Sequence, residues 1–136
     1  SRVLKSKGVD VIDCSSGGIR GAPVVSAGPV GYGYQVPYAE KLKKEALIQT
    51  MAVGLIVHAD QAEEILQSGR ADLIAIAREA MQNPNWPLDA AQKLNASAPY
   101  ALMPSPYEYW LEKRAKQVET LIPSTQTDGI NIRPSD

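Results

Sequence analysis

Hydrophobic residues gather in three short runs, and a segment with helical periodicity separates each run from the next. The runs cover residues 9–14, 51–57 and 71–77, and they consist mainly of valine, isoleucine, leucine and alanine. Runs that are apolar at nearly every position are typical of strands covered on both faces. The pattern therefore predicts three buried strands connected through helices.

The segments around these runs carry the start and stop signals of helices. A helix end precedes the first strand, where Gly8 is placed to terminate it. Pro37 suits the first turn of a second helix. Asp60 is predicted to cap a third helix, with Glu63 three residues on as in a capping box, and Gly69 to end it. The second helix has an apolar stripe made of Val36, Ala39, Leu42 and Ala46.

The last third of the chain has a different pattern. A short helical turn is expected after Arg78, followed by a break at residues 83–87 that contains two prolines. Further helices are predicted over 88–94 and from Tyr107 to about Leu121. The polar segment 122–136 predicts a flexible tail, so that the domain itself is expected to cover residues 1–121.

Strand–helix–strand units with tight connections predict parallel strands and right-handed crossovers. Three strands cannot close on themselves, and a (β/α)8 barrel takes about 250 residues. We therefore expect an α/β chain that forms either the last βα units of a barrel, incomplete as it stands, or a small open sheet. The chain begins at Ser1, inside the first predicted helix, which favours a part of a longer protein.

The composition is that of an ordinary soluble globular protein. Of the 136 residues, 44% are hydrophobic and 21% are charged, and the net charge is −1. This balance argues against a nucleic-acid-binding or membrane-binding surface. The single cysteine, Cys14, excludes an internal disulfide and favours a reducing, cytoplasmic compartment.

Small and polar residues follow each predicted strand. Ser15, Ser16 and Gly17 follow the first strand, Gly54 lies in the second, and Ala77-Arg78 ends the third. In a barrel these places share one rim, where strand ends and a helix start often bind phosphate. Backbone N–H groups at a helix start favour an anion, and arginine adds a two-pronged contact. Each signal is weak alone, and their shared placement predicts a phosphate site.

The order of several segments resembles the Old Yellow Enzyme family of flavin oxidoreductases. The similarity is strongest to its bacterial branch of xenobiotic reductases and thermophilic-type ene-reductases, and it extends over about residues 3–114. The segments that carry the resemblance are 8–18, 34–40, 52–56, 62–66, 69–74 and 76–79, with Asn83-Pro84 after them.

The resemblance implies a fold, a cofactor and roles for particular residues. The chain would supply about strands six to eight of a TIM barrel that binds FMN. Gly54 would donate its backbone N–H to the FMN phosphate, and Ala77 and Arg78 would hold the phosphate from the other side, although the family usually has glycine before that arginine. The residues expected near the flavin are Ser15, Ser16, Gly17 and Gln35. The residues expected to line the substrate pocket, or to reach a neighbouring subunit of a homo-oligomer, are Trp110, Tyr107 and Arg114.

The same resemblance implies an ene-reductase, in which NAD(P)H reduces FMN and the flavin passes hydride to an electrophilic alkene. The family's His/His or His/Asn pair, its proton-donating tyrosine and its arginine beside the flavin lie upstream of the matched region. We therefore predict no catalytic residue in this chain, which would need the rest of the barrel or a second chain. Two alternatives remain: another FMN- or phosphate-binding barrel enzyme, and a half-barrel without catalysis.

Several residues have simpler interpretations. Cys14 is expected to be a small buried apolar side chain, and His58 a structural or solvated histidine. Trp110 on a helix is more often a core or interface residue than an active-site wall. Asp10, Asp13 and Asp72 flank strands and are expected to pair with lysine or arginine. With one histidine and one cysteine, no metal site is predicted.

Overall fold

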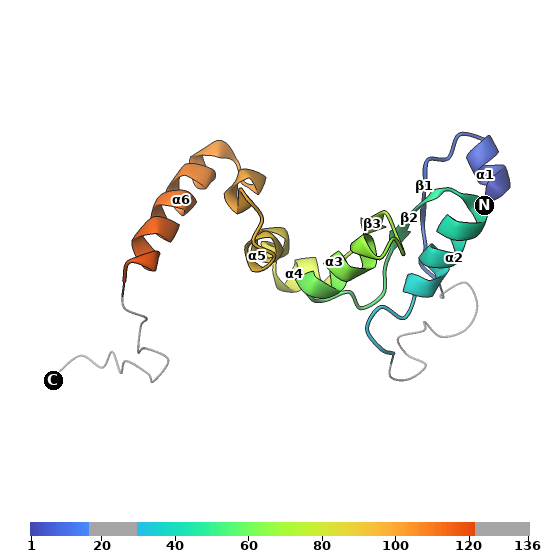
Figure 1. Cartoon of the computed structure of the whole chain (residues 1–136), viewed down its shortest axis with the longest axis horizontal. Helices are drawn as coiled ribbons and strands as arrows, with labels where there is room; N and C mark the ends of the chain where they lie inside the picture. The colour runs from blue at the N-terminus through green and yellow to red at the C-terminus, as the bar shows by residue number, and fades with distance from the viewer. Residues whose placement is uncertain (17–29, 122–136) are drawn as a thin grey trace. The chain divides into compact units, whose positions relative to one another are not determined.

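The computed structural model describes residues 1–16 and 30–121 (Figure 1). The chain divides into two units, Ser1–Pro99 and Tyr100–Asp136. Gly17 and the tail 122–136 lie outside the described residues. The elements, in chain order, are α1 (Arg2–Ser6), β1 (Val11–Asp13), α2 (Val36–Ala46), β2 (Gln49–Ala52), α3 (Ala59–Gln67), β3 (Leu73–Ile74), α4 (Arg78–Gln82), α5 (Trp86–Lys93), the 3₁₀ helix η2 (Pro99–Leu102) and α6 (Ser105–Glu119).

The three predicted strands form one parallel sheet in the order β1-β2-β3. This confirms the parallel arrangement expected from the tight strand–helix–strand units. Each strand is shorter than its hydrophobic run. The second run extends to Val57, but β2 ends at Ala52 because Gly54 and Leu55 have φ values of +111° and +50°, which turn the backbone out of the sheet.

The predicted helix signals are confirmed at three positions and wrong at one. Gly8 and Gly69 have φ values of +87° and +70° just after α1 and α3, and Pro37 lies in the first turn of α2. Asp60 does not cap α3. The N-cap is His58, two residues earlier, and the carboxylate of Asp60 instead forms an ion pair with Lys93 at 2.8 Å.

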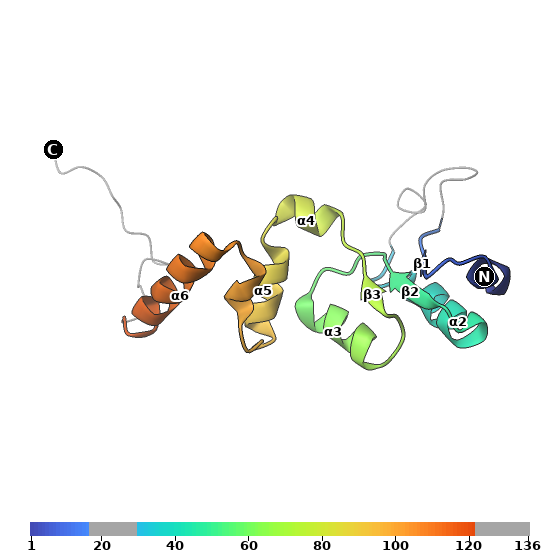
Figure 2. The ribbon, with the colours of Figure 1, turned by 90° about the horizontal axis from the view of Figure 1, so that it is seen from above.

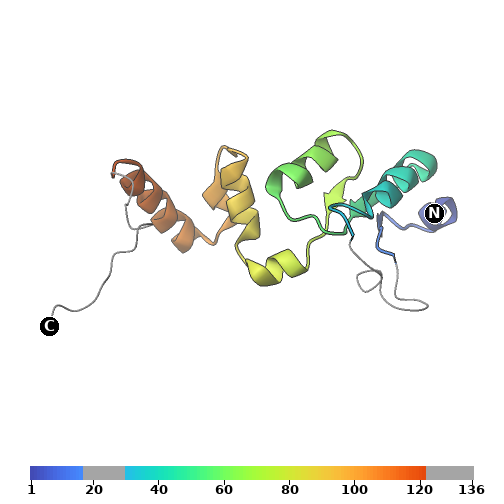
Figure 3. The same ribbon diagram turned by 90° about the horizontal axis from the view of Figure 1, so that it is seen from below.

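The core of the first unit lies between the sheet and the helices α2 and α3, which cover the same face (Figures 2 and 3). Alternation along the strands directs Ile12, Thr50, Ala52 and Ile74 toward these helices. Ala39 and Ala52 are fully buried, which lets α2 approach the sheet closely. The buried cluster consists of Cys14, Val36, Ala39, Ala52, Ile56, Ala62, Ile65 and Ala71.

The opposite face of the sheet also carries apolar side chains. Met51 is paired with Asp13 and Leu73 in neighbouring strands, so the three side chains share this face. Leu73 is 44% exposed. In a closed (β/α)8 barrel the face turned away from the helices points into the packed interior. The α/β architecture is therefore consistent with an incomplete barrel.

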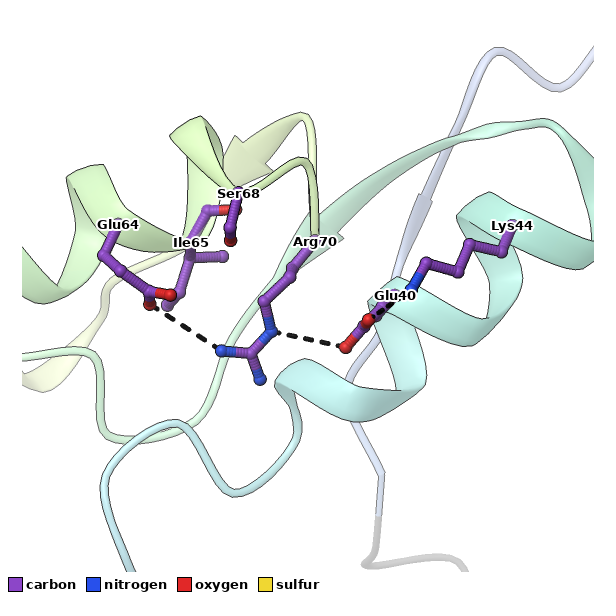
Figure 4. Close-up of polar contacts among 6 residues, drawn as sticks. All are labelled: Glu40, Lys44, Glu64, Ile65, Ser68 and Arg70. Carbon is purple, nitrogen blue, oxygen red and sulfur yellow. Dashed lines mark hydrogen bonds and ion pairs between the residues drawn. The ribbon is translucent and has the colours of Figure 1, made fainter.

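Ion pairs connect α2 to α3 on the outer surface of this unit. Arg70, just after α3, contacts Glu40 of α2 with its Nε at 3.3 Å and Glu64 of α3 with an Nη atom at 3.7 Å (Figure 4). Glu40 also pairs with Lys44 one helical turn away. The contacts with Lys44 and Arg70 hold the pKa of the Glu40 carboxyl below its ordinary value. These side chains are partly exposed, so the network orients the two helices and contributes little stability.

Thr50 is a polar residue placed inside the core. Its side chain is fully buried, and its hydroxyl has no hydrogen-bond partner among the described residues. A buried hydroxyl without a partner costs free energy of folding. We expect Thr50→Val to raise the free energy of unfolding by about 1 kcal/mol in urea titrations. Thr50→Ser, which keeps the hydroxyl and loses the methyl group, should lower it, and a Thr50→Val protein less stable than the wild type would contradict this interpretation.

Asp72 joins β2, β3 and α2 through its carboxylate. It accepts a hydrogen bond from the Thr50 backbone N–H at 2.9 Å and pairs with the Lys43 ammonium at 3.0 Å. Burial acts to raise the pKa of this carboxyl, but the Thr50 hydrogen bond and Lys43 together outweigh it, so the pKa lies below its ordinary value. This confirms the expected pairing of Asp72, whereas Asp13 accepts the Ser15 backbone N–H.

A carboxyl whose pKa is lower in the folded state stabilises the protein above the pKa of the unfolded chain, and this contribution is lost as the pH falls through the folded pKa. We expect Asp72→Asn to lower the free energy of unfolding by about 1 kcal/mol at neutral pH. The difference from the wild type should shrink below about pH 4. Urea titrations from pH 3 to pH 7 measure it, with Asp10→Asn, on an exposed aspartate, as the control. A difference that does not depend on pH would contradict the assignment.

The described part of the second unit contains α6 and most of η2. α6 begins at Ser105, two residues before the predicted helix, with Pro106 in its first turn. Val118 in the last turn of α6 and Leu121 just after the helix are exposed, as are the aromatic residues of its first half. Across residues 1–16 and 30–121, no helix is long and apolar enough to cross a bilayer.

Candidate functional site

The loops that follow the three strands meet at one edge of the sheet. They begin at Cys14, Val53 and Ala75, and parallel strands place their carboxyl ends together. A pocket of about 100 Å³ opens at this edge. Its walls come from the loop before α2, the loop after β2 and the junction of β3 with α4: Tyr34, Gln35, Val53, Gly54, Leu55, Ile56, Ala75, Ile76, Ala77, Arg78 and Glu79.

Gly54 occupies a position where any side chain would be strained. A Cβ atom there would lie 3.0 Å from Cε1 of Tyr34 and 3.1 Å from Nε2 of Gln35. Its φ of +111° is also unfavourable for any residue with a side chain. Gly54 was expected within the strand, but it lies in the loop two residues after β2. Its backbone is therefore free of the sheet and lines the pocket.

Polar groups of several kinds line the pocket, among them backbone N–H groups, the Arg78 guanidinium and the Glu79 carboxylate. Within the described residues, no acceptor is found for the N–H groups of Gly54, Ala77 and Arg78. Arg78 is the first residue of α4, where N–H groups have no partner inside the helix. Both Ala77 and Arg78 are exposed. Amide donors together with an arginine favour an anionic group, and phosphate in particular.

Gln35 links the loop after β1 to the wall of the pocket. The side chain is only 4% exposed, and its Oε1 accepts hydrogen bonds from the backbone N–H of Ser16 and from the Ser16 hydroxyl at 2.7 Å. The structure thus brings Gln35, Ser16 and Gly54 together. Ser15 is exposed next to Ser16, and its backbone N–H binds Asp13.

Besides apolar residues, two polar residues line the pocket that were given no role from the sequence. Tyr34 packs against Gly54, and Glu79 follows Arg78 in the first turn of α4. Tyr34 could have been found from its place beside Gln35 before a predicted helix. Glu79 carried no such signal, because an acidic side chain is not expected beside an anion site.

The loop between Gly54 and α3 is held by side chains from two elements. Gln61 accepts the Val57 backbone N–H with its Oε1 at 2.9 Å and donates its Nε2 to the Leu55 carbonyl at 3.1 Å. Trp86 donates its indole N–H to the Val57 carbonyl at 2.8 Å and packs against the buried cluster.

The predicted break at 83–87 is shorter than expected, because α5 begins at Trp86. His58 is exposed, as expected, with its ring edge against Tyr32 at 5.4 Å between centroids.

The residues expected to serve the substrate pocket or a neighbour lie on α6. Tyr107 is 62% exposed and Trp110 is 66% exposed, so Trp110 is not a core residue of its unit. Trp110 packs edge to face with Tyr109, and the Lys113 ammonium lies 4.4 Å from the centroid of the Tyr109 ring. Arg114 is exposed one helical turn after Trp110. These side chains present an aromatic and cationic surface to solvent.

Metal and thiol chemistry find no support in the described part of the chain. The described residues contain no group of three or more His, Cys, Asp or Glu side chains that could hold a metal ion. Burial raises the pKa of the Cys14 thiol, and the neighbouring Asp13 carboxylate acts in the same direction. A buried thiol with a raised pKa is a poor nucleophile, which confirms Cys14 as a small core residue.

The edge of this parallel βα sheet carries a glycine loop, an arginine and amides that have no acceptor among the described residues, and β/α proteins often bind phosphorylated ligands at such an edge. Residues 2–97 match the model of the NADH:flavin oxidoreductase / NADH oxidase family, and the chain belongs to this family. This confirms the resemblance to flavin oxidoreductases of the Old Yellow Enzyme type.

Proteins similar to the chain include several bacterial proteins named NADPH dehydrogenase. The chain is 54% identical over 94 residues to the protein of Halalkalibacterium halodurans, which covers 69% of the chain and 27% of that protein. It is 47% identical over 106 residues to the protein of Bacillus velezensis and 45% identical over 106 residues to that of Bacillus subtilis, each covering 78% of the chain and 29% of the relative. The chain therefore spans between a quarter and a third of the length of these relatives.

Proposed function

We propose that this chain forms the phosphate-binding end of an FMN-dependent NAD(P)H oxidoreductase, contributing about strands six to eight of its barrel. The observation that carries the proposal is the pocket that Gly54 lines together with Ala77 and Arg78, in a backbone conformation that disfavours any side chain at Gly54. The family to which the chain belongs and the names of its relatives support the same reaction class.

The residues present suit the phosphate of FMN. Gly54 would donate its N–H to one side of the phosphate, and Ala77 would do so from the other side. Arg78 would give a charge-assisted contact, which is shorter and stronger than a neutral hydrogen bond. The alanine at position 77 is compatible with this role, since the contact uses its backbone. Ser15, Ser16 and Gly17 would lie near the flavin. Glu79 lines the same pocket, and its carboxylate would repel ligands that carry a larger negative charge than the FMN phosphate.

The rest of the active site would come from outside these residues. When bound, FMN supplies two-electron chemistry, taking hydride from NAD(P)H and delivering it to an activated C=C bond of an enone or a related electrophile. This chain would bind and orient the cofactor, and the remaining barrel strands would bind and protonate the substrate. Tyr107, Trp110 and Arg114 on α6 would line the substrate pocket of a neighbouring subunit in a cytoplasmic homo-oligomer, since their exposure leaves them available for such a contact.

The proposal is tested by the affinity of the purified protein for FMN and for riboflavin, which lacks the phosphate. Binding is measured by quenching of flavin fluorescence. The wild type should bind FMN much more tightly than riboflavin. When the rest of the barrel is present, it should also oxidise NADPH on addition of an enone. Arg78→Gln should weaken FMN binding about tenfold, because it removes the charge-assisted contact, and should leave riboflavin binding nearly unchanged.

Arg70→Gln is the matched control, because Arg70 lies in the ion-pair network between α2 and α3, away from the pocket. It should leave both flavin affinities as they are. Equal affinity of the wild type for FMN and riboflavin would exclude a phosphate role for this pocket. FMN binding by the complete barrel without enone-dependent NADPH oxidation would favour a different FMN-binding barrel enzyme.

A further inference from the structure

The amide of Gln35 is the most buried polar side chain beside the pocket. Only 4% of the residue is exposed, yet it lies in a loop immediately before α2, where side chains usually face water. A buried amide is stabilised only if its polar atoms are hydrogen-bonded. Its contacts therefore indicate what the residue does.

The orientation of this amide follows from its partners. A backbone N–H can only donate, so the atom of Gln35 that faces the Ser16 N–H must be the oxygen. The Ser16 hydroxyl donates to the same oxygen at 2.7 Å. Nε2 is thereby directed to the other side. It lies 3.1 Å from the place that a Cβ of Gly54 would occupy, and Gln35 lines the pocket.

The contacts join three separate segments of the chain. Ser16 belongs to the loop after β1, Gly54 to the loop after β2, and Gln35 to the turn before α2. The Cβ of Gln35 also lies 3.2 Å from the position of a Gly54 Cβ, so the stem of the side chain packs directly on the glycine. The side chain of Gln35 therefore contacts both the loop after β1 and the loop after β2.

We propose that Gln35 is a positioning residue that clamps the loop after β1 to the loop after β2 and so holds the phosphate pocket in its binding shape before the ligand arrives. The proposal rests on the proposed function for the identity of the ligand, but the clamp itself is a property of this chain. A preformed site binds more tightly because less ordering is needed on binding. The gain in affinity from the preformed pocket should therefore be larger for FMN, which carries the phosphate, than for riboflavin, which lacks it.

The test is a double-mutant cycle with Gln35→Met, which keeps the length of the side chain without the hydrogen bonds, and Ser16→Ala. We expect Gln35→Met to weaken FMN binding about tenfold and riboflavin binding less than about twofold. Ser16→Ala should have a smaller effect of the same kind. The double variant should lose less than the sum of the two, because both substitutions break the same contact. Additive losses, or equal losses for FMN and riboflavin, would overturn the proposal.

A third variant and a ligand-free measurement separate the clamp from the identity of the ligand. Gln35→Glu keeps an oxygen that accepts from Ser16 and places a carboxylate beside the pocket. It should preserve slow hydrogen exchange of the Ser16 amide and still weaken FMN binding, whereas Gln35→Met should accelerate that exchange in the protein without flavin. If the wild type has no preference for FMN, the proposed function fails, and the Ser16 exchange rates still decide whether the clamp exists. Unchanged exchange in Gln35→Met would refute the clamp even if FMN binds.

Discussion

Gly54→Ala is expected to reduce the FMN affinity of the protein at least tenfold, by a strain of about 1–3 kcal/mol placed directly in the pocket. The new Cβ would meet Tyr34 at 3.0 Å and Gln35 at 3.1 Å, which is tighter than nine in ten real Cβ contacts. These side chains and the loop must shift to relieve the crowding, and a shift of the loop moves the Gly54 N–H from the place where a phosphate would accept it. Flavin fluorescence quenching measures the loss.

Gly69→Ala provides a matched control for this substitution. Gly69 also has a positive φ, +70°, but no atom lies within 4 Å of the position of its Cβ. Both variants carry the conformational cost of alanine in the left-handed region, about 1 kcal/mol, and only Gly54→Ala crowds the pocket. Gly69→Ala should therefore lower the melting temperature and leave the FMN affinity unchanged. Similar FMN losses in the two variants would show that Gly54 acts through stability alone.

Ile65→Ala is expected to lower the free energy of unfolding by about 2–5 kcal/mol, the largest stability effect in this chain. Ile65 is 2% exposed and lies on the face of α3 that packs on the sheet. Removing most of its side chain leaves a cavity next to alanine residues, which cannot fill it. Urea titration monitored by circular dichroism measures the change.

Ile65→Val tests the cavity explanation within the same site. It removes a single methylene group and should cost about 0.5–1.5 kcal/mol. A graded loss from isoleucine to valine to alanine is the expected result. If Ile65→Val were as destabilising as Ile65→Ala, the cavity explanation would be contradicted. The shape of the side chain would then matter more for stability than the volume left empty.

The order and type of the elements could be read from the sequence because they depend on local signals. Glycine at Gly8 and Gly69 ends helices since it adopts positive φ at low cost. The hydrophobic runs identified the three described strands, but they did not show where strand pairing stops. Apolar residues extend beyond the point at which the backbone leaves the sheet, so the run is longer than the strand. Gly54 shows this difference, since it lies inside an apolar run and outside β2.

The cap of α3 was misplaced for a related reason. Asp60 with Glu63 is a good local capping pattern, yet the helix begins at Ala59 because Gln61 and Trp86 hold the preceding loop through its backbone at Leu55 and Val57. Asp60 is then free to pair with Lys93. Contacts between segments distant in the chain outweighed the local preference.

The sequence by itself determined the α/β class, the parallel direction of the strands and the family, because these depend on periodicity and on ordered motifs. It also indicated Gly54, Ala77 and Arg78, since each follows a strand and strand ends of a parallel sheet meet at one edge. Only the tertiary structure decided that Tyr34 and Gln35 close on Gly54, and that Gln35 binds Ser16. Gln35 and Ser16 are 19 positions apart in the sequence. Contacts between such distant residues depend on how the chain packs and not on the local preference of any one segment.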